Sequence, residues 1–123
     1  MAMRRTATSL VLAACLVVTA VASTGAAAMG HRATKTVRAS GASWSPTTVR
    51  ISTGDTIKWK AVSGSHTVTA YRGGWTFNKS LATGDVQSRV FRRSGTFRFR
   101  CSFHSTLANG QCSGMCGKVV VRS

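Results

Sequence analysis

Short segments in which polar and apolar residues alternate fill the sequence from residue 34 onward. Thr56 to Lys60 and Thr96 to Arg100 alternate with a period of two, which puts every second side chain on the same face of a strand. Clusters such as Ser52-Thr-Gly-Asp55 and Ser94-Gly95 separate these segments and are typical of turns. No segment after residue 28 has a helical period. The pattern therefore predicts an all-β domain, a Greek-key β-sandwich of short strands.

The expected strands can be placed along the chain from their alternation and their flanking turns. Two looser segments interrupt them, one at residues 72–81 and one between residues 100 and 117. The strands are expected at residues 34–39, 44–51, 56–60, 66–71, 85–91, 96–100 and 117–122.

The first 28 residues differ in composition from the rest of the chain. Arg4 and Arg5 precede an apolar run, and Ala26-Ala27-Ala28 follows it with the small residues that a signal peptidase reads. This order is typical of a secretory signal peptide. The residues before Cys15 also resemble a lipoprotein cleavage box, so lipidation at Cys15 is the alternative. We expect a protein that is secreted or attached to the cell surface.

Removal of residues 1–28 would leave a short polar lead-in at residues 29–36 and a single domain at 37–123. Residues 29–123 contain 15 Lys and Arg residues and only two acidic residues, Asp55 and Asp85, which gives a net charge of +13. Such a surface attracts anionic partners, such as cell-surface polymers, lipid headgroups or acidic proteins. With two acidic residues, both in turns, the chain offers no hydrolytic pair.

The basic residues are scattered singly along the expected strands, and their densest group lies at residues 89–100. No nucleic-acid-binding motif accompanies this group, so we expect no nucleic-acid partner. The group consists of Arg89, Arg92, Arg93, Arg98 and Arg100.

Four residues with metal-binding side chains lie at the ends of expected strands. His66 begins a strand, Cys101 ends one, His104 lies in the next loop and Met115 ends that loop. Two imidazoles, one thiolate and one weak thioether form the ligand set of blue-copper electron-transfer sites. Loops of a sandwich cluster at its two ends, so Cys101 and Met115 must lie at the same end. His66 joins them if its strand neighbours the last two strands.

On these residues the sequence resembles the cupredoxins, most closely their plastocyanin-like group. The resemblance covers roughly residues 34–122. Its most specific segments are Ser65-His66-Thr67-Val68, Gly95 to His104, and Gly114 to Val121. The resemblance implies a β-sandwich that binds one type 1 copper ion, cycling between Cu(II) and Cu(I), and that is not an enzyme. The ligands that it implies are His66, Cys101, His104 and Met115.

The family also has an exposed apolar face around the second ligand His, where electrons enter and leave. Phe103 and Leu107 flank His104 and form that patch or simply pack within the loop. One departure from the family is the length of this loop, because ten residues, Ser105 to Gly114, separate His104 from Met115. Backbone amides near Thr67 and Ser102 are the candidates that hold the imidazoles and the sulfur in place.

A second departure is the pair of cysteines on either side of Met115. Residues 29–123 contain three cysteines, and an odd number outside the cell requires an explanation. A thiolate of Cys101 on the metal and a disulfide between Cys112 and Cys116 would account for all three and would fix Met115. Free thiols that widen the site, or a disulfide that includes Cys101 and destroys it, are the alternatives.

The sequence thus predicts a secreted, monomeric blue copper protein that transfers single electrons between redox partners. Its charge favours an acidic partner protein or contact with an anionic cell surface. Two other functions remain as alternatives. One is a copper carrier or buffer, and the other is a disulfide-stapled structural sandwich without a metal.

Overall fold

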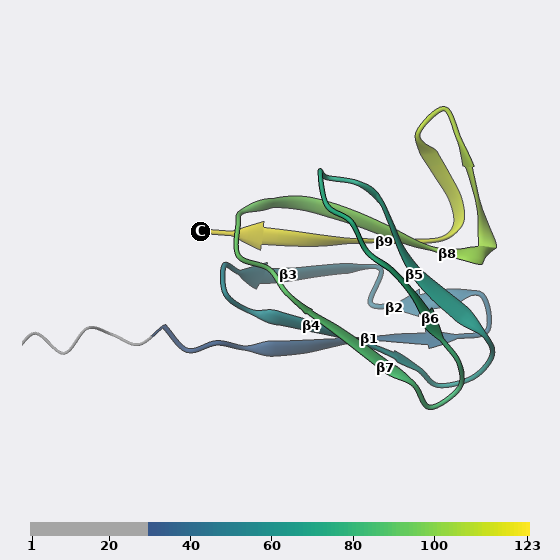
Figure 1. Ribbon diagram of the computed structural model, residues 1–123, viewed down its shortest axis with the longest axis horizontal. Helices are drawn as coiled ribbons and strands as arrows, with labels where there is room; N and C mark the ends of the chain where they lie inside the picture. The colour runs from purple at the N-terminus through teal and green to yellow at the C-terminus, as the bar shows by residue number, and fades with distance from the viewer. Residues whose placement is uncertain (1–29) are drawn as a thin grey trace, which may run out of the picture.

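The computed structural model describes residues 30–123, which form nine β-strands and no helix (Figure 1). The expected signal peptide and Cys15 lie outside these residues. No helix within residues 30–123 is long and apolar enough to cross a membrane. The strands are β1 (Thr34–Ser40), β2 (Ser43–Ser45), β3 (Thr48–Ser52), β4 (Thr56–Ala61), β5 (His66–Arg72), β6 (Asn78–Leu81), β7 (Val86–Val90), β8 (Gly95–Ala108) and β9 (Gln111–Arg122).

The strands form two sheets, which confirms the predicted β-sandwich. One sheet has four strands in the order β2-β1-β4-β7, and the other has five in the order β3-β9-β8-β5-β6. Two strand pairs, β1–β4 and β3–β9, are parallel, and the other pairs are antiparallel. The first strand begins at Thr34, so residues 34–36 of the expected lead-in belong to β1.

The core forms where the inward-facing residues of both sheets meet. In β4, Ile57, Trp59 and Ala61 are buried while Lys58 and Lys60 point outward, as the alternation predicted. Phe99 of β8 packs edge-on against Trp59, with ring centroids 5.4 Å apart. Burial of one such side chain contributes about 1.5–3 kcal/mol. This core fixes the positions of the first part of β5 and the middle of β8.

The turn before β4 is closed by a buried carboxylate. The backbone N–H groups of Ser52 and Ala33 donate hydrogen bonds of 2.9 and 2.8 Å to the two carboxylate oxygens of Asp55. These hydrogen bonds, first that of Ser52 and then that of Ala33, hold the pKa of Asp55 below its usual range, because they favour the charged form. The turn predicted at residues 52–55 is therefore anchored by its own aspartate.

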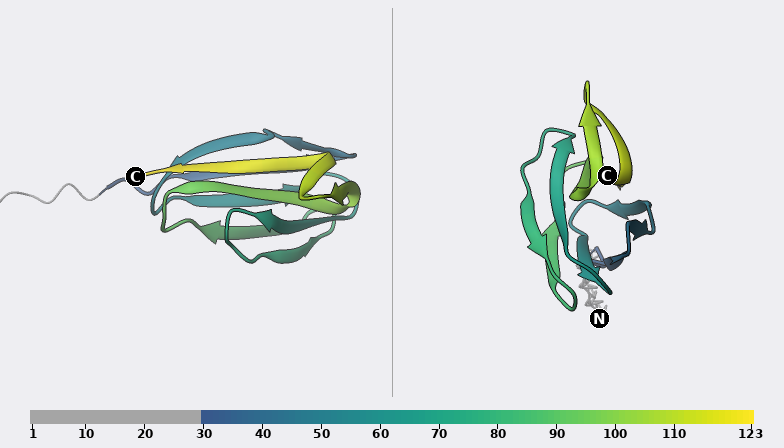
Figure 2. Two further views of the ribbon diagram at one scale, coloured as in Figure 1. Left: turned by 90° about the horizontal axis from the view of Figure 1, so that it is seen from above. Right: turned by 90° about the vertical axis from the view of Figure 1, so that its right-hand side faces the viewer.

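The segment between His104 and Met115 is not the loop that the sequence suggested. β8 continues to Ala108 and β9 begins at Gln111, so the ten residues form a hairpin that extends the two last strands. Leu107 pairs with Cys112 and Thr106 with Ser113 in this hairpin. Asn109 and Gly110 make its turn, a dipeptide that two-residue hairpin connections favour. Figure 2 shows the hairpin projecting beyond the sandwich.

The segment at residues 72–81 also contains more regular structure than expected. Its last part, Asn78–Leu81, is the edge strand β6, which pairs with β5. Leu81 lies opposite His66 in this pairing and is fully buried. The edge strand thus covers the start of β5, where His66 lies.

Candidate metal centre

Three residues with metal-binding side chains meet at one end of the five-stranded sheet. His66 is the first residue of β5, and Cys101 and His104 lie on β8, the strand beside β5. The ladder between β8 and β9 is irregular from Arg100 to Ser105, and this irregularity includes the Cys-x-x-His segment. His66 therefore joins the other two residues because its strand is their neighbour, which is the condition that the sequence left open.

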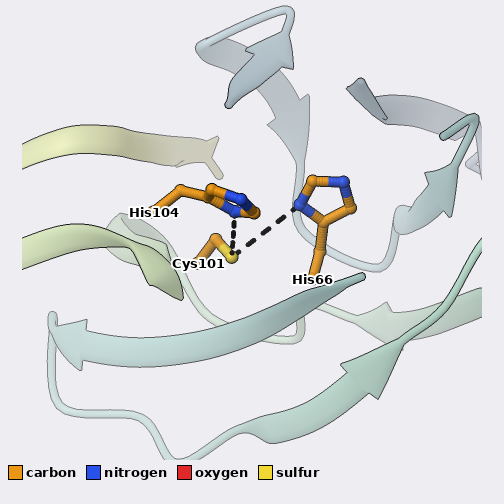
Figure 3. Close-up of side chains that lie close together, drawn as sticks. All are labelled: His66, Cys101 and His104. Carbon is orange, nitrogen blue, oxygen red and sulfur yellow. Dashed lines mark hydrogen bonds between the residues drawn. The ribbon is translucent and has the colours of Figure 1, made fainter. Parts of the chain in front are cut away.

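The donor atoms of this cluster point toward one another (Figure 3). The Sγ atom of Cys101 lies 3.8 Å from Nδ1 of His66 and 3.4 Å from Nδ1 of His104. All three donor atoms lie within 4.8 Å of one another. His66 and Cys101 are buried, whereas His104 is exposed. The cluster therefore has a closed side toward the core and an open side toward solvent.

The ring of His66 is held by a backbone carbonyl on the side away from the sulfur. Its Nε2 atom lies 2.7 Å from the carbonyl oxygen of Ser63. With Nε2 as the donor, the proton is on that nitrogen and the lone pair is on Nδ1, which faces the cluster. Such a hydrogen bond to the second ring nitrogen orients a ligand imidazole and fixes its tautomer.

The sulfur of Cys101 receives one hydrogen bond from the neighbouring strand. The backbone N–H of Thr67 lies 3.5 Å from Sγ, as expected for one of the two candidate amides. The other candidate is wrong, because the N–H of Ser102 donates to the hydroxyl of Thr67 at 2.8 Å and not to the sulfur. The Thr67 hydroxyl also lies 2.9 Å from that of Ser102, so it ties the two strands together beside the sulfur.

The bend that brings His104 back to Cys101 is fixed by the residue that follows it. The hydroxyl of Ser105 donates to the carbonyl oxygen of Cys101. Nη1 of Arg100 lies 3.0 Å from the Ser105 hydroxyl oxygen and donates to it. Sequence reasoning did not identify Ser105 or Arg100, although a serine directly after the ligand His is well placed to cap the turn.

Met115 lies on β9, opposite the irregular part of β8, and is only 1% exposed. The indole N–H of Trp44 donates to the backbone carbonyl of Met115 at 3.1 Å. The Trp44 ring lies 6.3 Å from that of His66, measured between centroids. Trp44 therefore connects the Met115 backbone to the imidazole side of the cluster. Ligation by Met115 stays a prediction.

The two cysteines beside Met115 form a disulfide. Cys112 and Cys116 are bonded, with their Cα atoms 6.1 Å apart, and Cys101 is a free, buried thiol. The predicted pairing is thus confirmed, and the alternative of a disulfide to Cys101 is excluded. The disulfide closes a small loop around Met115 and leaves one thiol in the cluster.

Two apolar side chains lie exposed near the open side of the cluster. Phe103 is 66% exposed and Leu107 is 40% exposed, although both are large and apolar. Phe103 belongs to the Cys-x-x-His segment and Leu107 to the projecting hairpin. They do not pack inside a loop, so the structure leaves them available for contact with another molecule.

The cluster fits a type 1 copper ligand set. With metal–nitrogen and metal–sulfur bonds of about 2.0–2.3 Å, three ligand atoms in a trigonal plane are about 3.5–4 Å apart. The two distances from sulfur to imidazole nitrogen, 3.8 and 3.4 Å, agree with this spacing. One thiolate and two imidazoles also suit a soft metal that changes between Cu(I) and Cu(II).

Comparison with known proteins supports the fold. No protein-family model and no curated protein matches the sequence. Among solved structures, a purple cupredoxin from Nitrosopumilus maritimus has 26% identity and a TM-score of 0.56, over 71% of this chain and 98% of that one. A Cu(I) amicyanin variant has 20% identity and a TM-score of 0.60, over 72% of this chain and 82% of that one.

A copper-containing nitrite reductase from Thermus scotoductus is similar over a smaller part of its own length. The two sequences are 22% identical and the TM-score is 0.59. The similar region covers 72% of this chain but only 22% of the reductase chain. The two sheets and these similarities establish the cupredoxin fold. Together with this fold, the His66–Cys101–His104 cluster at one end of the sandwich supports a cupredoxin.

Proposed function

We propose that the protein binds one type 1 copper ion and transfers single electrons between redox partners. The observation that carries the proposal is the convergence of Sγ of Cys101 with Nδ1 of His66 and His104. When bound, copper would supply a one-electron couple between Cu(II) and Cu(I). We propose an electron carrier and not an enzyme, and the nitrite reductase with a similar structure shares only 22% of its own chain with this one.

Each residue of the site has a distinct part in this function. Cys101 holds its sulfur inside the core, where the Thr67 N–H stabilises negative charge on it. The Ser63 carbonyl keeps His66 from rotating, so the ligand geometry changes little between oxidation states. Exposed His104 gives electrons the shortest route between the buried cluster and a partner at the protein surface.

A visible absorption spectrum tests this proposal directly. The purified protein is titrated with one equivalent of Cu(II), and an intense thiolate-to-copper charge-transfer band is expected. The band should disappear in Cys101→Ser and should persist in Ser113→Ala, a control on the hairpin. A colourless complex of the unaltered protein would show that Cys101 does not bind copper and would refute the proposal.

Copper delivery is a second candidate, favoured by the exposure of His104. A ligand that water can reach allows a chelator or an apo-protein to take the metal, whereas a buried ligand slows the exchange. Fast electron self-exchange with slow loss of copper to a chelator would favour the electron carrier. Rapid, complete transfer of copper to the chelator would favour the copper carrier. Failure to bind one equivalent of copper would favour a structural sandwich without a metal.

The partner of the electron carrier is proposed from the surface near His104. The exposed side chains of Phe103 and Leu107 would contact the partner, and the positive charge of the chain would attract an acidic one. Electron-transfer rates with an acidic partner should then fall as the salt concentration rises, because salt screens this attraction. A rate independent of salt would contradict an acidic partner.

We also propose that the protein is secreted and is a monomer. Secretion is supported by the composition of residues 1–28, and lipidation at Cys15 is the alternative. Mass spectrometry of the protein recovered from the producing cells would distinguish the two, since cleavage after Ala28 removes Cys15. An intact N-terminus would contradict both.

A further inference from the structure

An open cleft of about 550 Å³ lies between the start of β8 and the loops that follow β5 and β7. Its lining combines three arginines, Arg89, Arg92 and Arg93, with the aromatic rings of Trp75, Phe91 and Phe97. Phe91 and Phe97 are buried and belong to the core, and Trp75 packs against it. The cleft thus has a rigid aromatic floor and a basic rim. Its volume lies within the range of roughly 300–1,000 Å³ that small-molecule sites occupy.

The cleft is separate from the copper ligands. His66 is the first residue of β5, whereas Trp75 follows the last residue of that strand, Arg72. At about 3.3 Å per residue, β5 spans about 20 Å between them. The turn between β7 and β8 lies at the left-hand end in Figure 1, opposite the end where the β8–β9 hairpin rises. A ligand in the cleft would therefore not touch the metal centre.

Two of the arginines are held in place by aromatic rings and carbonyl oxygens. The guanidinium carbon of Arg89 lies 5.4 Å from the ring centroid of Trp75, and its Nη1 donates to the Thr76 carbonyl at 2.8 Å. The guanidinium carbon of Arg93 lies 5.3 Å from the Phe97 centroid, and its Nη2 donates to the Gly74 carbonyl. Each guanidinium has five N–H donors, so most donors of both groups remain for a ligand.

The positive charge of the cleft is not neutralised by a carboxylate. No acidic residue from the described part of the chain lines it. The only two acids in residues 30–123 are engaged elsewhere, since Asp55 accepts from Ser52 and Ala33 and Asp85 accepts from the N–H of Ala82 at 3.0 Å. Arg92 is exposed beside the two fixed arginines. Three guanidinium groups without a carboxylate partner at one cleft favour an anion with several acceptor oxygens.

From this arrangement we propose that the cleft binds the phosphoryl group of a phosphate ester. A phosphoryl group presents two or three charged oxygens, and guanidinium forks bind such oxygens in pairs. A carboxylate presents only two oxygens in one plane, so it matches three guanidinium groups less well than the three oxygens of a phosphoryl group, which point in different directions. The organic part of the ester would lie in the remaining volume of the cleft. The ester is either a soluble phosphate compound or the headgroup of a phospholipid, since both present the same chemistry.

The test uses the reduced protein labelled with nitrogen-15 and titrated with glycerol phosphate, inorganic phosphate or acetate. The indole N–H signal of Trp75 should shift and saturate with glycerol phosphate and phosphate, and much less with acetate. The indole signal of Trp44, which lies beside Met115, should stay in place and serves as the internal control. Equal binding of acetate, or equal shifts of both indoles, would overturn the proposal.

Matched variants separate the cleft from the general charge of the protein. Arg92→Gln with Arg93→Gln should weaken phosphate binding roughly tenfold or more, because each substitution removes a charged donor of hydrogen bonds to the phosphate. Arg38→Gln with Lys58→Gln removes the same charge from the four-stranded sheet and should have a small effect. Arg92→Lys alone keeps the charge and the fold but loses the fork, so it should still weaken binding. Equal weakening by both double variants would refute a specific site.

Sedimentation with vesicles identifies the source of the ester. Vesicles of phosphatidylglycerol mixed with phosphatidylcholine are compared with phosphatidylcholine alone. Binding to the anionic vesicles that the Arg92→Gln, Arg93→Gln variant loses would assign a lipid headgroup. Binding of glycerol phosphate without vesicle binding would assign a soluble ester. If neither glycerol phosphate nor vesicles bind at the cleft, the proposal fails, whatever the copper spectrum shows.

Discussion

Gly114 allows β9 to pass close to the segment that carries His104, and its replacement by alanine tests this packing. The backbone φ angle of Gly114 is +98°, a conformation that side chains rarely adopt. A Cβ atom at this position would lie 2.5 Å from the carbonyl oxygen of His104 and 3.2 Å from Cα of Ser105. Both partners are backbone atoms, so neither can rotate away. Gly114→Ala must therefore move β9 away from the metal centre.

The expected loss of unfolding free energy in Gly114→Ala has two parts. Forcing alanine into a positive φ angle costs about 1–2 kcal/mol. The contact with His104 requires a backbone shift, which costs about 1–3 kcal/mol more, as overpacking usually does. Gly84→Ala is the matched control, because Gly84 has a φ angle of +87° but a Cβ atom added there would meet no described atom within 4 Å. Gly84→Ala should therefore lose only the free energy that the positive φ angle costs.

Urea unfolding of the copper-free protein measures both variants against the unaltered chain. We expect Gly114→Ala to lose about 2–5 kcal/mol of unfolding free energy and Gly84→Ala about 1–2 kcal/mol. The copper-loaded spectrum should change only in Gly114→Ala, because only that residue contacts the ligand segment. Equal losses in the two variants, with unchanged spectra, would show that the approach of β9 to His104 is not tight.

Four further predictions concern single features of the fold and the site. Because the pKa of Asp55 is lowered by folding, its contribution to stability is complete above the usual carboxyl pKa and is lost as the pH falls through the lowered value. Asp55→Asn should therefore flatten the acid limb of unfolding measured below about pH 4. Removing the disulfide with Cys112→Ala and Cys116→Ala should cost about 2 kcal/mol in urea unfolding, because the loop that it closes is short, and a larger loss would mean that the disulfide also supports packing. Phe103→Ala should slow electron transfer to a partner without lowering the melting temperature, since the side chain is exposed; an unchanged rate would remove Phe103 from the contact surface. Met115→Leu should cost less than about 1.5 kcal/mol of stability but should shift the copper spectrum and the midpoint potential, whereas an unchanged spectrum would leave Met115 as core packing only.

The sequence predicted the strands best where the apolar residues of an alternating pattern all face the core. In β4, every second residue is buried, so the periodic pattern and the structure agree. The hairpin at residues 105–114 was missed because its Ser, Thr, Asn and Gly residues are typical of a loop. It is a strand only because β8 and β9 hydrogen-bond to each other, a pairing that no local pattern encodes. The short edge strand β6 was missed for the same reason.

The clustering of three candidate ligands could be predicted from the sequence, but the groups that orient them could not. His66, Cys101 and His104 carry chemistry in their side chains, and their positions at strand ends indicate that they meet. The groups that orient them are mostly backbone atoms, such as the Ser63 carbonyl and the Thr67 amide. Every residue has such atoms, so only the folded chain shows which ones are used. Trp44, 71 positions before Met115, reaches its carbonyl for a similar reason.

The distance between the metal centre and the basic cleft constrains how the two proposed functions are related. The length of β5, about 20 Å, separates them. At physiological ionic strength the Debye length is about 8 Å, so the charge of a bound phosphate is largely screened at the copper site. Phosphate binding should therefore leave the midpoint potential nearly unchanged. A ligand in the cleft would instead determine where the protein is held, with His104 and Phe103 at the opposite end remaining open to a redox partner. A phosphate-dependent shift in potential would require a structural coupling through β5 or β8.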